Sequence, residues 1–139
     1  MADLRVLPTL FRPHKNNAAF FVAKSKKAMI SLAPGEKAVG RLLVDKSGGL
    51  FGTAGSGGAA PGDGTIFKLS PPGKARTTWT ETTLWTFTGG SAGVSPASGL
   101  VADKAGTLYG TSELGATSGC EFGFGCGAVF SLTGSGYEP

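Results

Sequence analysis

The stretch DKSGGLFGT at residues 45–53 returns as DKAGTLYGT at residues 103–111, with six of the nine positions identical. A second pair of blocks follows in the same order, because GTIFKL at residues 64–69 returns as GAVFSL at residues 127–132. The first pair is offset by 58 residues and the second by 63, so the second copy holds about five more residues between its blocks. A unit that returns at such a period is typical of propellers and solenoids, and it predicts a chain built from structural repeats.

The composition favours many short strands. Glycine accounts for 24 of the 139 residues, and the glycines lie between short runs rich in Val, Leu, Phe, Thr and Trp. Such runs between tight turns are typical of an all-β protein. There is no Gly-X-Y period, which excludes collagen. A charged fraction of 16% and a hydrophobic fraction of 40% argue against disorder over most of the chain.

One repeat contains four predicted strands. In repeat one they are a hairpin over residues 41–53, a strand over residues 64–69 and a strand over residues 79–88. Repeat two shows the hairpin over residues 98–111 and the third strand over residues 127–132. Four antiparallel strands in about 60 residues form the blade of a β-propeller. We therefore predict an all-β, propeller-like fold of four-stranded antiparallel blades.

The fourth strand of repeat one shows the alternation of a strand with two different faces. A period of two places Leu84 and Thr86 on one face and Thr83, Trp85 and Phe87 on the other.

The repeats also predict the division of the chain. Residues 1–17 are a basic leader without strand pattern, expected to be poorly ordered, and residues 18–139 are the β-blade domain. Within that domain, residues 18–40 read as a degenerate copy with a third and a fourth strand, followed by repeat one over residues 41–97 and repeat two over residues 98–139. About two blades are too few for a closed propeller, which needs about four or more. We therefore expect association with copies of the chain, or membership of a longer array.

The charge is uneven. Residues 1–46 hold nine Lys and Arg against three Asp and Glu, whereas residues 47–139 hold four against six. A cluster of cations can bind nucleic acid or an anionic surface. However, Lys24, Lys26 and Lys27 lie at a predicted turn without interleaved aromatic residues for base stacking. Nucleic-acid binding is therefore not favoured.

No segment predicts membrane insertion or export. The chain has no apolar run of 18 residues, so no transmembrane helix is expected. Residues 1–17 lack the apolar core of a signal peptide. Either the protein stays in the cytoplasm or this N-terminus is not the natural one.

Three blocks together resemble a known bacterial tandem repeat called GloVer, or Gloeo_Verruco. They are the hairpin at residues 99–111, the strand at residues 64–69 and the segment at residues 79–90, and the resemblance covers about residues 40–136. It implies a propeller fold with many copies and an extracellular or envelope location, and it offers no catalytic residues. The chain departs from the family in its two clear copies, its basic N-terminus and its lack of an export signal.

The two cysteines lie in the loop that carries the additional residues of repeat two. Cys120 and Cys126 are separated by five residues, two of them glycine, and this spacing allows a disulfide. The resemblance supports the pairing, since loops of the family often carry such a pair. A disulfide would restrain a Gly-rich loop and imply an oxidising compartment; free thiols are the alternative. Zinc is disfavoured because it takes three or four ligands and the single histidine, His14, lies in the leader.

Asp45 and Asp103 precede the glycine-containing hairpin turns of the two repeats. Their carboxylates can act as ligands for a cation such as Ca²⁺, or they can accept hydrogen bonds from backbone N–H groups of an Asx-type turn. No further acidic residue has the spacing of a Ca²⁺ loop, so we favour the turn role.

Catalytic patterns are missing from the sequence. A single histidine leaves no Ser-His-Asp set. Glu81, Glu113 and Glu121 have no recognisable partner along the chain, although pairing in space stays open. The Gly-rich loops at residues 55–58 and 123–125 match neither the Walker nor the dinucleotide pattern. We predict no catalytic, cofactor-binding or metal-binding residue.

The sequence therefore favours a non-enzymatic repeat module that acts as a scaffold or binding surface through the loops at residues 54–63 and 112–126. The contact residues that we expect in the second loop are Glu113, Glu121, Phe122 and Phe124. Two alternatives remain: a propeller hydrolase or lyase whose site forms on assembly, and binding of nucleic acid or an anionic surface through the basic N-terminal third.

Overall fold

The computed structural model describes residues 18–23, 26–58, 63–73, 78–89, 94–115 and 125–139. The regular secondary structure in these ranges consists of β-strands, and all paired strands are antiparallel. The predicted all-β class with antiparallel sheets is therefore confirmed. The predicted leader, residues 1–17, lies outside the described residues.

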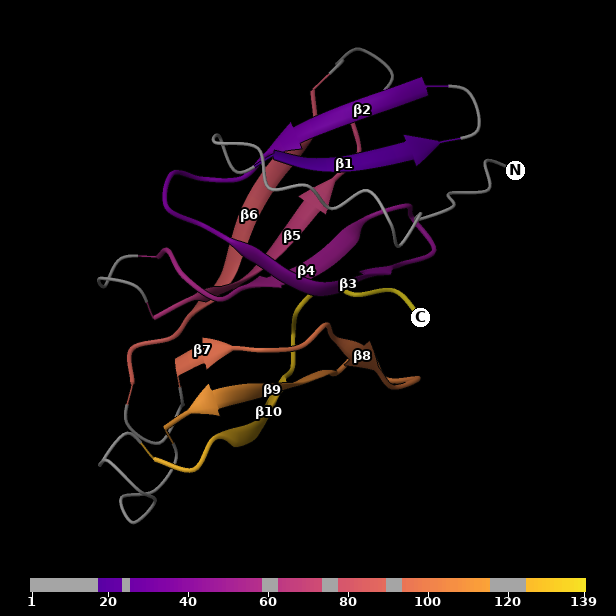
Figure 1. The fold of residues 1–139 in the computed structure, drawn as a ribbon. Helices are drawn as coiled ribbons and strands as arrows, with labels where there is room; N and C mark the ends of the chain where they lie inside the picture. The colour runs from indigo at the N-terminus through magenta and orange to yellow at the C-terminus, as the bar shows by residue number, and fades with distance from the viewer. Residues whose placement is uncertain (1–17, 24–25, 59–62, 74–77, 90–93, 116–124) are drawn as a thin grey trace.

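The described residues form three sheets (Figure 1). The first is a hairpin of β1 (Ala18–Ala23) and β2 (Lys26–Ser31). The central sheet contains, in chain order, β3 (Ala38–Val44), β4 (Leu50–Ala54), β5 (Thr65–Ser70) and β6 (Thr80–Thr86). The third sheet contains β7 (Val94–Pro96), β8 (Val101–Ala102), β9 (Leu108–Leu114) and β10 (Ala128–Leu132). Over the ranges given above, these sheets do not close into a ring.

The third sheet repeats the hydrogen-bond register of the central sheet. Gly52 on β4 lies opposite Phe67 on β5, and Gly110 on β9 lies opposite Phe130 on β10. All five residue pairs between β9 and β10 correspond to those between β4 and β5 at the sequence offsets of 58 and 63. The sequence repeat is therefore also a repeat of strand pairing.

The first strand of the repeat is irregular in both sheets. In the central sheet, the register of β3 against β4 shifts between Val39 and Leu43. In the third sheet the same stretch is divided into β7 and β8, which pair with β9 one after the other along the edge opposite β10. The register shift of β3 in the first copy therefore corresponds to the break between β7 and β8 in the second copy.

A close contact explains the repeated glycine. A Cβ atom on Gly52 would lie 2.6 Å from Cζ of Phe67, and one on Gly110 would collide with Phe130 in the same way. Each phenylalanine ring lies across the glycine of the neighbouring strand. The repeat therefore needs a residue without a side chain at this position.

The hydrophobic core lies on both faces of the central sheet. On one face, Leu32 after β2 packs in a cluster with buried residues of β4 and β5 that include Leu50 and Phe67. On the other face, the central sheet packs against the third sheet in a cluster of Phe51, Ile66, Phe87, Leu100 and Leu108. Phe87 and Phe130 add an edge-to-face contact between the two sheets, with ring centroids 5.2 Å apart.

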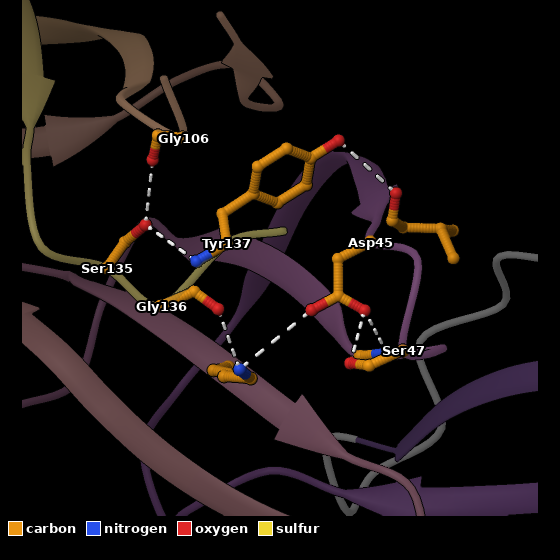
Figure 2. Close-up of polar contacts among 9 residues, drawn as sticks. Asp45, Ser47, Gly106, Ser135, Gly136 and Tyr137 are labelled. Atoms are coloured by element: carbon orange, nitrogen blue, oxygen red, sulfur yellow. Dashed lines mark hydrogen bonds and ion pairs between the residues drawn. The ribbon is translucent and has the colours of Figure 1, made fainter. Parts of the chain in front are cut away.

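The segment after β10 returns to the central sheet. The Tyr137 ring meets Phe51 edge-on at a centroid distance of 5.4 Å, and its hydroxyl donates to the Val44 carbonyl at 3.4 Å. Ser135 Oγ donates to the Gly106 carbonyl and accepts a hydrogen bond from Tyr137 N, both at 3.2 Å (Figure 2). This segment therefore ties the turn before β9 to the end of β3.

One face assignment of the sequence analysis was wrong. Leu84 packs against the cluster that contains Phe87, instead of lying on the opposite face. The register of β6 against β5 shifts here, since Trp85 lies opposite Ile66 but Thr83 lies opposite Phe67. Leu84 is thus the additional residue of a β-bulge, which interrupts the alternation of faces.

Candidate functional site

The predicted contact loop is described only at its base. Glu113 lies on β9 with an exposed side chain, whereas Glu121, Phe122 and Phe124 lie outside the described residues. Gly115 and Gly125 form a β-bridge, and Cys126 N donates to the Gly115 carbonyl at 3.1 Å. The two ends of the loop are therefore joined at the end of the third sheet.

The cysteine pair falls partly within the structure. Cys126 is not a free thiol, whereas Cys120 lies outside the described residues. The Cys120–Cys126 disulfide stays a prediction.

Asp45 is buried in the turn between β3 and β4. Its Oδ1 accepts hydrogen bonds from Gly49 N and Ser47 Oγ, both at 2.7 Å (Figure 2). Its Oδ2 lies 3.9 Å from Nζ of Lys68, which also lies 4.9 Å from the centroid of the Phe51 ring. The carboxylate therefore organises the turn, and the lysine offsets its charge.

Asp103 organises the corresponding turn between β8 and β9. Its Oδ1 accepts hydrogen bonds from Ala105 N and Thr107 N, and its Oδ2 accepts one from the Tyr109 hydroxyl, all at 2.9 Å. The Thr107 N–H first and then the Tyr109 hydroxyl lower the pKa of Asp103, because both stabilise the ionised carboxylate. Across the ranges that the structure describes, no three His, Cys, Asp or Glu side chains form a group that could hold a metal ion.

A carboxyl pair lies between residues that the sequence analysis did not connect. Glu36, in the segment before β3, is fully buried, and its Oε1 accepts a hydrogen bond from Thr65 Oγ1 at 2.6 Å. Glu81 Oε2 accepts one from Ala33 N at 3.0 Å. Together the two glutamates attach residues 33–36 to the central sheet.

This pair holds a proton near neutral pH. The pKa of Glu81 is raised to about 7, first by burial and then by its hydrogen bond with Glu36 and the negative charge of that residue. Glu36 Oε2 and Glu81 Oε1 are buried without another partner, so a proton on Glu81 supplies the donor that the two oxygens lack. The residues are 45 positions apart, and no local pattern in the sequence marks them as a pair.

The outer face of the third sheet exposes large apolar side chains. Val129 is 79% exposed, Val101 65% and Tyr109 37%. Through the shared register, Val129 corresponds to Ile66 and Tyr109 corresponds to Phe51. Those two residues of the central sheet are 1% and 0% exposed, because the third sheet covers them. The same face of the repeat is thus covered in the first copy and open in the second.

No family model, curated protein or solved structure matches the chain. The part of the chain described here contains no helix that could span a membrane.

Proposed function

We propose that the chain is a non-enzymatic β-propeller-type repeat module, of the kind that GloVer repeats form, and that it acts as a scaffold by associating with copies of itself. The observation that carries this proposal is the outer face of the third sheet, defined by Val101, Tyr109 and Val129. Its counterpart on the central sheet is buried under the next repeat.

The energetics favour covering this face. Fully burying an exposed Val, Leu, Ile, Phe or Met side chain is worth about 1.5–3 kcal/mol. Val129 and Val101 still expose most of their surface on this face. The repeat already contains the complementary surface, because Leu100 and Leu108 of the third sheet cover Phe51 and Ile66 of the central sheet. A further repeat would cover Val129 in the same manner, which is how successive blades pack in propellers. In a second copy of this chain the corresponding surface of the central sheet is already packed against Leu32, so association of two chains buries Val129 against a different surface.

The solution mass, measured by light scattering during size-exclusion chromatography, tests the proposal. We expect a mass above that of the monomer, and we expect Val129→Lys to reduce it because a charge would enter the contact. Ala105→Lys adds the same charge to an exposed turn and serves as the matched control, with no change in mass. A protein that stays monomeric at all concentrations up to about 10⁻⁴ M would have a dissociation constant above that value. Such binding is weaker than that of a specific interface of standard size, so this result would exclude self-association as the function.

A further inference from the structure

The third sheet lacks the neighbour that completes the central sheet. In the central sheet, β5 pairs with β4 on one edge and with β6 on the other. Its counterpart β10 pairs with β9 only, and its second edge has no strand partner among the residues that the structure describes. An unpaired edge presents backbone N–H and C=O groups that can pair with an added strand.

An apolar groove lies beside this edge. It encloses about 170 Å³, and its walls come from both sheets. The lining residues are Ile66, Trp85 and Phe87 on the central side and Phe130, Ser131 and Leu132 on β10. Trp85 is 46% exposed, whereas Ile66 and Phe87 beside it are buried. β6 thus presents an apolar surface at the place where the third sheet has no fourth strand.

We propose that this groove binds an extended peptide strand from another polypeptide, which adds to the edge of β10 and places alternate apolar side chains against Trp85. The pairing of β5 with β6 defines the register. Leu69 lies opposite Glu81 in the central sheet, so a strand on β10 places its equivalent residue opposite Leu132, facing the groove. Since the groove is apolar, the occupant carries an aliphatic or aromatic residue at this position and at every second position from it.

On its outer side, the edge of β10 accepts an occupant residue of either charge. On that side, Lys68 of β5 corresponds to Ser131 of β10, which is small and uncharged. The occupant is therefore selected by its apolar alternation and by its ability to extend. Val129 belongs to the same strand, but its side chain is exposed on the outer face, whereas the groove lies on the inner side of β10, so the proposal does not depend on self-association.

The probe is a fluorescent synthetic peptide with the sequence of residues 78–89 carrying Glu81→Leu and Thr83→Val, and binding to the protein is followed by fluorescence anisotropy. We expect saturable binding. We also expect at least about tenfold weaker binding for the peptide that keeps Glu81, because its carboxylate would lose water in the groove. Trp85→Ala in the protein weakens binding by a similar factor, with circular dichroism to check that the variant stays folded.

N-methylated peptides test strand pairing directly. Methyl groups on alternate backbone nitrogens block one edge of a strand and leave the other edge and all side chains unchanged. We expect one of the two alternating patterns to abolish binding and the other to preserve it, because only one edge of the peptide faces β10. Val101→Lys also places a charge on the outer face but lies on β8, across β9 from β10, so it leaves peptide binding unchanged.

Three results would overturn the proposal. The first is no binding of the unmethylated Leu peptide. The second is equal binding of both methylated peptides, which would indicate apolar adhesion without strand pairing. The third is a loss of solution mass on Trp85→Ala without peptide binding, which would show that a second copy of the chain occupies the groove.

Discussion

At the scale of single residues, the two repeats preserve one carboxylate and change its partner. Asp45 and Asp103 both accept hydrogen bonds from the backbone of their turns. In the first copy the second carboxylate oxygen lies near Lys68. The counterpart of this lysine is Ser131, and in the second copy the oxygen instead accepts a hydrogen bond from Tyr109, which replaces a phenylalanine. The exchange of Phe for Tyr thus compensates for the loss of the lysine.

The carboxyl pair predicts how stability depends on pH. Glu81 has a folded pKa of about 7, above the 4.5 of an unperturbed glutamate, so the folded protein holds a proton that the unfolded chain has lost between these values. Its contribution to the free energy of unfolding therefore decreases as the pH rises from about 4.5 to about 7. We expect Glu81→Gln to remove this decrease, since glutamine always offers a donor to Glu36.

Urea denaturation at pH 5 and pH 8 measures the effect on stability. Glu113→Gln is the matched control because Glu113 is exposed on β9, and it should follow the wild-type pH dependence. If the wild type and Glu81→Gln change equally between the two pH values, Glu81 does not hold the proton.

A substitution of Gly110 on β9 tests whether the Phe130 ring requires glycine at this position of the repeat. Gly110→Ala places a methyl group against the Phe130 ring, so the ring or the strand must move. We expect a loss of about 1–3 kcal/mol in the free energy of unfolding, the range for overpacked cores. Gly73→Ala is the control, because nothing lies within 4 Å of the added atom. Equal stabilities of the two variants in urea would mean that the ring does not constrain this position.

At the scale of strands, sequence patterns predicted those features that are encoded locally. The hairpins at Asp45 and Asp103 could be predicted because each turn carries its own carboxylate and glycine next to alternating strands. The bulge at Leu84 could not be predicted, since it depends on how β6 pairs with β5. The pair of Glu36 and Glu81 was missed for the same reason: it exists only after residues 33–36 fold back onto the central sheet.

Leu100 and Val101 are neighbours in the sequence but lie on opposite faces of the third sheet. Leu100 is buried in the cluster between the sheets, whereas Val101 is exposed on the outer face. We expect Leu100→Asp to unfold the protein or to lower its thermal stability strongly, because an unpaired charge would enter the core.

Val101→Asp is the control for this substitution. It adds the same charge one residue later and should leave the thermal unfolding of dilute protein nearly unchanged. The opposite ranking of the two variants would mean that the faces of the third sheet are assigned to the wrong sides.

At the scale of the whole molecule, the uneven charge predicts how copies are arranged. The hairpin of β1 and β2 carries Lys26 and Lys27 and no acidic residue, while residues 94–115 and 125–139 hold only Lys104 against Asp103, Glu113 and Glu138. The hairpin of β1 and β2 and the third sheet lie at opposite ends of the stack of sheets (Figure 1). Head-to-tail association therefore brings opposite charges together, whereas a two-fold contact between third sheets brings like charges together.

Salt distinguishes these two arrangements. Added salt shortens the Debye length from about 10 Å at 0.1 M to about 3 Å at 1 M, which weakens both attraction and repulsion between exposed charges. If copies associate head to tail, the solution mass at a fixed protein concentration falls as salt rises. Glu113→Lys, on the outer face of the third sheet, then weakens association at low salt and has little effect at high salt. An increase of mass with salt, together with stronger association of Glu113→Lys at low salt, would instead show that like-charged third sheets meet across a two-fold axis.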